Sequence, residues 1–329
     1  MKNLDELIDK LRDYKFSHML ATAVGIGFLD ALVENQEIPI SLISKKTGIQ
    51  IGYAKGFART LQHAGLVILT DSCDCKLTEL GIQAQQNEVF NSFSSYHMHV
   101  FEAWSSLRTC CREGMAGGKF HRQRIEEPDF CKAYLLAMDA IAAKNLNFLK
   151  KRCLPLIHGR VLDIGAGPST FCRHLAKGNI EHVTGIDLDP IVTMAQKLFD
   201  YPENYSWESN EFENFQPEER FDCIYCSHIL EYCTQTELVV WIQKIKKLLK
   251  PGGISAFVIF LREADISTET LGLDMFEIST GVNGAHLGHI ANEQEIVTIC
   301  SDNGGSLIDC SPLPGEASYS EYLITCKWS

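Results

Sequence analysis

The sequence lacks any apolar run approaching the roughly 20 residues that a membrane-spanning helix needs. It also lacks a basic stub followed by an apolar core. Its first stretch, MKNLDELIDKLRDYKF, instead has the pattern of a charged amphipathic helix, which excludes a secretion signal. Positive charge is scarce, with 30 Lys and Arg against 42 Asp and Glu and a net charge of −12, so the protein has no general attraction for nucleic-acid phosphates or anionic lipid. These absences predict a cytoplasmic protein that binds neither membranes nor nucleic acid.

The 13 cysteines lack the even number and regular spacing of a disulfide framework. Because no export signal is present, most of these thiols are expected to be small buried hydrophobic side chains. Cys223 and Cys226 have C-x-x-C spacing, but no second C-x-x-C or histidine pair follows at zinc-finger distance. They lie on an expected strand, where residues three apart point to opposite faces, so one metal ion could not easily take both thiols.

The length of 329 residues is enough for two domains. Near the start, ISLISKKTG and QIGYAKGFARTLQHAG read as helices that end at glycines, and LVILT, DSCDC and KLTELG read as a hairpin. This order predicts a winged-helix domain over residues 1–87. DNA binding through Lys55, Arg59 and His63 is an alternative, but their neighbours are mostly apolar and no basic cluster follows one face. Dimerisation is therefore the favoured role of this domain.

Residues 88–153 carry apolar side chains at helical spacing, interrupted by a glycine-rich loop. We expect these linker helices to cap a substrate cleft. From Arg160 onward, short apolar strands such as RVLDIG, HVTGIDLD and GGISAFVIFL alternate with helical stretches. This alternation predicts an α/β Rossmann-like domain over residues 154–329, with a mostly parallel sheet and helices on both faces. Ligands of such sheets bind beyond the C-terminal ends of the strands.

The stretch VLDIGAGPST is the most informative one for ligand binding. A strand ends at Asp163, and Gly165 and Gly167 follow in a tight turn into a helix, where glycine lets the backbone approach a ligand closely. The third glycine of a dinucleotide fingerprint is missing, because Thr170 stands in its place. Asp187 ends the next strand roughly 20 residues after the turn, where an acid can bind both hydroxyls of a ribose.

Together these motifs resemble the class I S-adenosylmethionine-dependent methyltransferases. SNEFENF stands where that family contacts adenine, YCSHILEY stands at its fourth-strand motif, and LLKPGG resembles its helix-to-strand turn. With the N-terminal pattern included, nearly the whole chain resembles the dimeric small-molecule O-methyltransferases of hydroxyindole and natural-product type. The resemblance implies a homodimer held by the winged helix. It also implies methyl transfer from S-adenosylmethionine to a small molecule of specialised metabolism, with S-adenosylhomocysteine as product.

The resemblance also implies contacts with S-adenosylmethionine. Gly165 and Gly167 would pass beneath its methionine part, and Asp187 would hold its ribose. The other implied cofactor residues order the turn, contact adenine or its edge, and lie near the methionine end; they are Asp163, Leu188, Asn210, Glu211 and Ser227.

The chain departs from the resembled family at the catalytic residue. The family's Leu-His-Asp-Trp reads Leu-Glu-Tyr-Cys here, which puts Glu231 where the general-base histidine belongs. We expect Glu231 and His228 to carry the acid/base role, with His286 near the substrate. A carboxylate partly buried beside a cofactor can have its pKa raised toward neutrality, and histidine titrates in the required range. Replacing Glu231 by glutamine is then expected to reduce turnover far more than cofactor affinity.

Two alternatives to this interpretation stay open. His286 and His289, with His228 and Glu231, suit a non-haem iron or zinc site, and some relatives that methylate carbon beside a keto group hold an enolate with a metal. The second alternative is a non-methylating enzyme that binds S-adenosylmethionine and catalyses a cyclisation or rearrangement. We favour methyl transfer without a metal, because substitution at carbon needs alignment more than acid/base help. The acceptor molecule and the atom that is methylated are not specified by these patterns.

Overall fold

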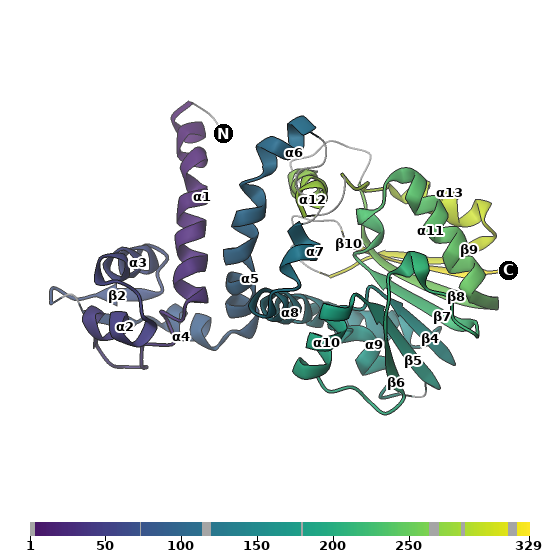
Figure 1. The fold of residues 1–329 in the computed structure, drawn as a ribbon, viewed down its shortest axis with the longest axis horizontal. Coiled ribbons are helices and arrows are strands. Elements are labelled where there is room, and N and C mark those ends of the chain that lie inside the picture. Colours follow the sequence, from purple (N-terminus) through teal and green to yellow (C-terminus); the bar gives the residue numbers. More distant parts are fainter. Residues whose placement is uncertain are drawn as a thin grey trace. The chain divides into compact units, whose positions relative to one another are not determined.

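The structure is a computed structural model that describes residues 4–72, 74–113, 120–178, 180–262, 270–283, 287–314 and 321–329. The chain forms two compact units, Met1–Glu102 and Ala103–Ser329 (Figure 1). Each unit is described by itself below, and the finer division at residues 87 and 153 stays a prediction. None of the helices in the described ranges has the length and apolar character of a membrane span.

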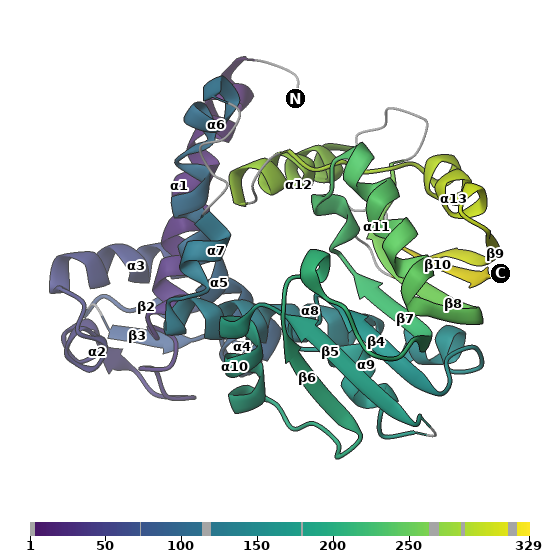
Figure 2. The same cartoon turned by 45° about the vertical axis from the view of Figure 1, so that its right-hand side comes forward.

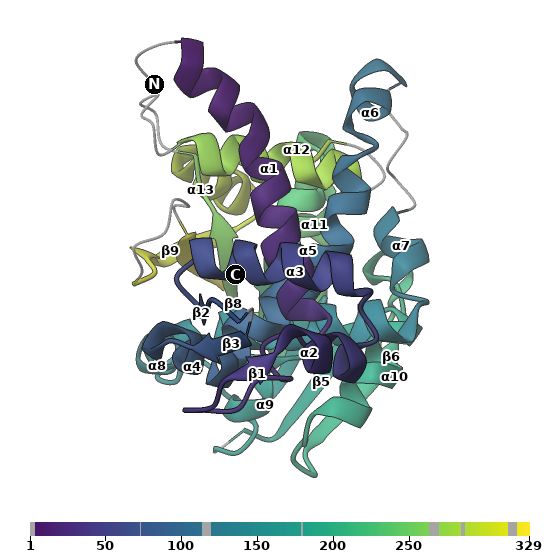
Figure 3. The same cartoon turned by 90° about the vertical axis from the view of Figure 1, so that its left-hand side faces the viewer.

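The first unit consists of helices and a small sheet, and it contains the two helices and the hairpin that the sequence predicts. Its strands pair antiparallel in the order β1-β3-β2, beside α2 and α3 (Figure 3). A buried apolar cluster that includes Phe28, Leu61 and Val67 joins the helices to this sheet. The elements are α1 (Leu4–Gly25), β1 (Ile38–Pro39), α2 (Ile40–Thr47), α3 (Ile51–His63), β2 (Val67–Leu69), β3 (Asp74–Leu77), α4 (Glu79–Gln86) and α5 (Glu88–Trp104), which crosses into the second unit.

The second strand of the hairpin is shorter than predicted. The sequence KLTELG was expected to form a strand, but β3 ends at Leu77 and α4 begins at Glu79. Thr78 explains the change, because its hydroxyl accepts a hydrogen bond from the Gly81 amide at 2.9 Å and so caps the new helix. Cys73, in the predicted turn, lies outside the described residues.

The second unit is built on a seven-stranded sheet in the order β6-β5-β4-β7-β8-β10-β9 (Figure 2). Neighbouring strands from β6 to β8 are parallel, and β10 is antiparallel to both β8 and β9. The predicted Rossmann-like α/β fold is therefore confirmed. The strands are β4 (Arg160–Ile164), β5 (His182–Asp187), β6 (Tyr205–Ser209), β7 (Phe221–Ser227), β8 (Leu249–Phe260), β9 (Gly305–Pro312) and β10 (Glu321–Trp328). The helices are α6 (Leu107–Glu113), α7 (Phe120–Arg124), α8 (Pro128–Cys153), α9 (Thr170–Leu175), α10 (Asp189–Leu198), α11 (Gln235–Leu248), α12 (Thr270–Asn283) and α13 (Glu293–Asp302), with short 3₁₀ turns η1 (Phe212–Asn214) and η2 (Leu230–Tyr232).

The two faces of this sheet pack against different helices. Leu162 and Cys226 belong to a buried cluster with residues of α11 and α13, whereas Val161 and Cys223 belong to another with residues of α8 and α9. This division follows from the alternation of side chains along a strand. It confirms that Cys223 and Cys226 point to opposite faces, and among the described cysteines all are free thiols.

The sequence patterns do not predict β6, β9 or α12. The two strands form the edges of the sheet, where only one neighbour pairs and more of each side chain remains in water. Their sequences, YSWES and GSLIDCSP, therefore lack the continuous apolar character of the central strands. α12 contacts α6, α7 and η2, so its position depends on segments that are distant in the sequence.

Two helices begin next to the C-terminal edge of the sheet, and each begins at a capping residue. Thr234 and Glu237 form the capping box of α11, with the Thr234 amide donating to the glutamate at 2.8 Å. The Asn292 side chain accepts a hydrogen bond from the Glu295 amide at 2.9 Å and begins α13. The residues just before each cap, which include His228, Glu231 and His289, therefore lie beyond the strands and before the helices.

Candidate active site

The glycine turn follows β4 and has the conformation that the sequence requires. Gly165 has a φ of +61° and Gly167 a φ of +51°, a region that favours glycine. A Cβ atom on Gly165 would lie 2.5 Å from the side chain of Ile229, whereas one on Gly167 would meet no protein atom within 4 Å. The protein itself thus fills the space beside Gly165 and leaves open space beside Gly167, which fits a ligand that passes over the turn.

The side chain of Asp163, at the end of β4, is hydrogen-bonded to this turn. Its carboxylate is buried, with the residue 2% exposed, and accepts a hydrogen bond of 2.5 Å from the Ser169 hydroxyl at the far end of the turn. Burial raises the pKa of Asp163 to about 7, against the hydrogen bonds from Ser169 and Cys172, which lower it. Asp163 is therefore hydrogen-bonded to the end of the turn and does not face solvent, and the role that the resemblance implies for it stays a prediction.

Asp187 ends β5 beside the turn. One carboxylate oxygen accepts from the Gly167 amide at 2.8 Å and the other accepts from the Leu188 amide at 2.7 Å. Burial raises the pKa of Asp187 to about 6, and these two hydrogen bonds lower it. Since each carboxylate oxygen can accept more than one hydrogen bond, both oxygens can still accept from the hydroxyls of a ribose. The geometry fits S-adenosylmethionine lying across the ends of β4 and β5.

Asn210 and Glu211 lie next to this edge, after β6. The Asn210 amide donates to the Asp187 carbonyl at 3.0 Å, which places Asn210 beside the end of β5. The Glu211 carboxylate forms an ion pair of 2.5 Å with Arg122 of α7. Arg122 could not be found from the sequence, because no local pattern indicates that α7 meets the segment after β6.

Ser227 and His228 follow the C-terminal end of β7, the strand next to β4. Ser227 is partly buried and pairs with Val258 of β8. His228 has a φ of +52°, and its amide donates to the Val258 carbonyl at 2.8 Å. A histidine in the left-handed region of backbone conformation is uncommon, and residues strained in this way cluster at functional sites. Its ring lies against Phe260, with centroids 4.5 Å apart, and its side chain is 31% exposed.

Glu231 lies behind His228 and is only 3% exposed. Its Oε1 accepts hydrogen bonds from the Phe260 amide at 2.8 Å and from the His228 ring at 3.1 Å through Nδ1. Its Oε2 is buried with no hydrogen-bond partner among the described residues. The structure thus brings together the two residues expected to carry acid/base chemistry, but it leaves the imidazole as the more accessible group.

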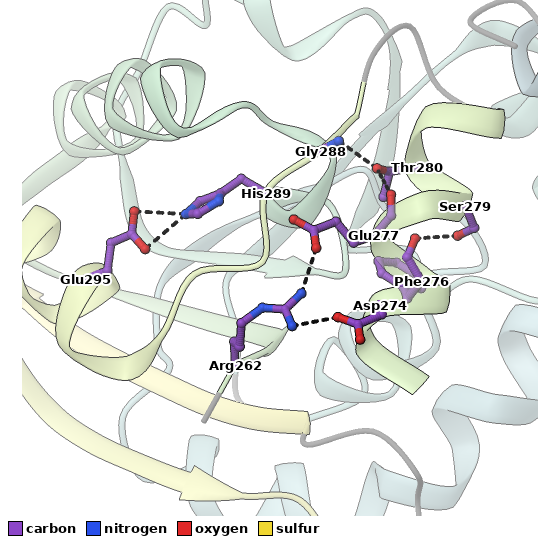
Figure 4. Close-up of polar contacts among 9 residues, drawn as sticks. All are labelled: Arg262, Asp274, Phe276, Glu277, Ser279, Thr280, Gly288, His289 and Glu295. Atoms are coloured by element: carbon purple, nitrogen blue, oxygen red, sulfur yellow. Dashed lines mark hydrogen bonds and ion pairs between the residues drawn. The ribbon is translucent and has the colours of Figure 1, made fainter. Parts of the chain in front are cut away.

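The histidines considered for a metal site do not converge in the described residues. The His289 ring contacts both carboxylate oxygens of Glu295, at 2.9 and 3.0 Å (Figure 4). His289 therefore anchors its loop to α13, and these contacts lower the pKa of Glu295. His286 lies outside the described residues. Within the described ranges, no group of three or more His, Cys, Asp or Glu residues is arranged to hold a metal ion.

Substitution of the two glycines by alanine is expected to separate stability from cofactor binding. Gly165→Ala forces a Cβ against Ile229 and is expected to destabilise the fold by about 1–3 kcal/mol. Gly167→Ala meets no protein atom, so its main effect is expected on S-adenosylmethionine affinity, about tenfold or more by loss of close approach. Denaturant unfolding and calorimetric titration measure the two effects, and wild-type affinity in Gly167→Ala would contradict the assignment of the turn.

The raised pKa of Asp163 predicts a pH-dependent stability. Because the folded-state pKa is about 7, above the ordinary value of 3.8, the protonated form is favoured in the folded protein, and this contribution to stability is lost as pH rises toward 7. Unfolding free energies of the ligand-free wild type and Asp163→Asn are compared at about pH 5 and about pH 8. The wild type is expected to lose about 2–3 kcal/mol relative to the variant. A difference that does not change with pH would show that Asp163 keeps an ordinary pKa.

Comparison with known proteins agrees with this geometry. Residues 161–253, which include the glycine turn, Asp187 and His228, match the family described as "Methyltransferase domain". No curated protein matches the chain.

Solved structures of similar fold cover nearly the whole chain. The mitomycin 7-O-methyltransferase MmcR has a TM-score of 0.83 at 14% identity, over 99% of this chain and 97% of that one. An O-methyltransferase family protein from Burkholderia thailandensis has a TM-score of 0.82 at 17% identity, over 100% and 99%. Human N-acetylserotonin methyltransferase, in complex with S-adenosylmethionine, has a TM-score of 0.78 at 15% identity, over 99% and 97%. Residues 161–253 of the chain therefore match a methyltransferase domain, and the chain as a whole has the fold of these O-methyltransferases.

Proposed function

We propose that the protein methylates a small molecule of specialised metabolism at an ionisable group, and that His228 removes the acceptor's proton. The observation that carries this proposal is the pairing of a half-buried imidazole with a buried carboxylate at the end of β7, next to the glycine turn. When bound, S-adenosylmethionine supplies an electrophilic methyl group. The chain's own residues then have to align the acceptor and accept one proton.

The roles of the pair follow from their burial. Glu231 is too buried to take a proton from an acceptor directly, but its Oε1 lies 3.1 Å from His228 Nδ1. A carboxylate at Nδ1 favours the tautomer with the proton on that nitrogen and leaves Nε2 as the acceptor. Although burial lowers the pKa of His228, the hydrogen bond and charge of Glu231 together with the charge of Glu321 raise it overall. We therefore propose that His228 is the base and that Glu231 orients its ring, whereas the sequence put Glu231 at the position of the family's general base.

The acceptor is proposed to be a small molecule with an acidic hydroxyl or enol. A base of this kind needs only to assist a group that already ionises readily, because alignment dominates the substitution itself. MmcR and human N-acetylserotonin methyltransferase carry names of small-molecule methyltransferases and share the fold. Their names support the class of acceptor proposed here.

We also propose that the protein is a cytoplasmic homodimer held by the first unit, with no nucleic-acid partner. The first unit has helices followed by an antiparallel hairpin, and several of its apolar side chains are exposed, among them Ile51, Tyr53 and Ile68. Light scattering of the full chain tests this proposal. A monomer at micromolar concentration, or binding to genomic DNA in a gel shift, would contradict it.

The experiment that tests the function is mass spectrometry of the full-length protein with S-adenosylmethionine and a small-molecule extract of the source cells. The expected result is S-adenosylhomocysteine together with a metabolite that is one methylene heavier. Cleavage of the cofactor to methylthioadenosine, or a rearranged metabolite with the cofactor unchanged, would replace the proposal by non-methylating chemistry. Activity that is lost with a chelator and restored by iron or zinc would indicate metal-assisted C-methylation instead.

A further inference from the structure

The ring of His228 faces a second carboxylate besides Glu231. Its Nε2 lies 3.7 Å from Oε1 of Glu321, which is the first residue of β10 and pairs with Phe260 across β8. This separation is longer than a hydrogen bond, so the lone pair of Nε2 stays available, while the negative charge of the Glu321 carboxylate still acts on the ring. The two carboxylates therefore lie at the two nitrogens of one imidazole.

Glu321 is held in this position by a neighbour from another element. Its Oε2 accepts a hydrogen bond of 3.0 Å from the side-chain amide of Asn145, in α8. The Glu321 side chain is 20% exposed, compared with 3% for Glu231. Glu321 is thus fixed relative to the ring and also reaches solvent, which Glu231 does not.

We propose that Glu321 is a positioning residue that raises the basicity of His228 and conducts to solvent the proton that His228 collects. This inference rests on the proposed function. The acceptor O–H bond breaks and an Nε2–H bond forms on His228, while the acceptor oxygen keeps the electron pair that attacks the methyl group. The protonated ring is then attracted to Glu321, the 3.7 Å separation closes to hydrogen-bond distance, and Nε2–H passes its proton to Oε1, from which the proton leaves to bulk water.

Among the described residues, these two carboxylates are the charged groups that face the ring of His228. η2 supplies Glu231 and β10 supplies Glu321, while β8 supplies the uncharged ring of Phe260. α8 contributes only the neutral amide of Asn145, behind Glu321. In the neutral tautomer the Nε2 lone pair faces a negative charge, and protonation replaces that repulsion by attraction. Both carboxylates accordingly raise the pKa of His228 above 6.5.

The test is an NMR titration of the histidine Cε1–Hε1 signals in the full-length protein, with the His228 signal identified by its loss in His228→Asn. The pKa of His228 in the wild type is expected above the ordinary histidine value of 6.5. In Glu321→Gln it is expected to fall by roughly one pH unit. The matched control is Glu293→Gln, which removes an exposed carboxylate from the first turn of α13 and is expected to leave the His228 pKa unchanged.

Kinetics give the second readout. In Glu321→Gln the acidic limb of kcat/KM is expected to move to lower pH with the NMR pKa, and kcat near neutral pH to fall about tenfold, with S-adenosylhomocysteine affinity unchanged. A His228 pKa that is the same in Glu321→Gln as in the wild type, or that shifts equally in Glu293→Gln, would overturn the inference. If Glu321→Gln does not fold, Asn145→Ala releases the carboxylate and is expected to shift the pKa in the same direction by less. Absence of methyl transfer in the wild type would refute the proposed function, whereas the titration would still decide whether Glu321 sets the basicity of His228.

Discussion

His228→Asn is expected to lower kcat by about 10²–10⁴-fold while leaving S-adenosylmethionine affinity nearly unchanged. Asparagine is the suitable replacement because it tolerates the left-handed conformation that His228 adopts, with a φ of +52°. The variant therefore keeps the backbone of the loop after β7 and removes the group that accepts the proton. Initial rates of S-adenosylhomocysteine formation and calorimetric titration measure the two quantities.

A second histidine provides the control for this experiment. His158 is exposed and precedes β4, at the edge of the sheet opposite the glycine turn. His158→Asn is expected to leave both kcat and cofactor affinity at the wild-type values. If His228→Asn also keeps the wild-type kcat, then His228 is not the base and the acceptor loses its proton without help from this loop.

Glu231→Gln separates the two roles within the pair. Glutamine retains an oxygen that can accept from the Phe260 amide but removes the charge that orients His228 and raises its pKa. A decrease in kcat of about 10–10²-fold is expected, smaller than that of His228→Asn, with cofactor affinity little changed. The reverse order, with Glu231→Gln the more severe variant, would make Glu231 the base, as the sequence alone suggested.

Asp187→Asn is expected to weaken binding of S-adenosylmethionine by about 10²-fold or more. Hydrogen bonds to a charged acceptor contribute about 1.5–3 kcal/mol each, and we propose that the carboxylate accepts from both ribose hydroxyls. The amide has one acceptor oxygen instead of two, so it also cannot accept from both the Gly167 and Leu188 amides as Asp187 does. The glycine turn should then lose part of its order. Calorimetric titration with S-adenosylhomocysteine measures the effect without turnover.

The same carboxylate predicts how binding depends on pH. Burial raises the pKa of Asp187 to about 6 in the ligand-free protein, so the wild-type affinity is expected to decrease as pH falls below about 6, where the charge is lost. Asp189→Asn, which changes an exposed acid in the first turn of α10, is the matched control and should keep both affinity and pH dependence. Equal affinity in Asp187→Asn and Asp189→Asn would remove Asp187 from the cofactor site.

The central part of the fold could be read from the sequence because its signals are local. The strands at Arg160–Ile164 and Phe221–Ser227 are buried on both faces, which requires apolar residues in succession. The glycine turn needs positive φ angles that favour glycine, and the helix starts at Thr234 and Asn292 need side chains that accept from the backbone. Each of these requirements acts within a few residues and therefore leaves a recognisable pattern.

The edges of the sheet and the arrangement of α12 could not be read in this way. α12 is joined to the end of β8 by Arg262, which forms ion pairs of 2.7 Å with Asp274 and 2.6 Å with Glu277 (Figure 4). The Thr280 hydroxyl accepts from the Gly288 amide at 2.6 Å, which fixes the other end of the helix. These contacts join residues that no periodic pattern relates, because the charges and the hydroxyl would suit any exposed helix equally well.

For the candidate site, the sequence alone was sufficient to locate the glycine turn after β4 and to place His228 and Glu231 beyond β7. It placed Glu231 first because the family's histidine stands at that position, and sequence position carries no information on burial. Tertiary packing then buries Glu231 under Phe260 and leaves the imidazole of His228 half-exposed. In the sheet, β10 lies antiparallel beside β8. This pairing brings Oε1 of Glu321 to 3.7 Å from Nε2 of His228, although the two residues are far apart in the chain. Such a contact depends on strand order and register, and those are set by the whole sheet and by no single segment of it.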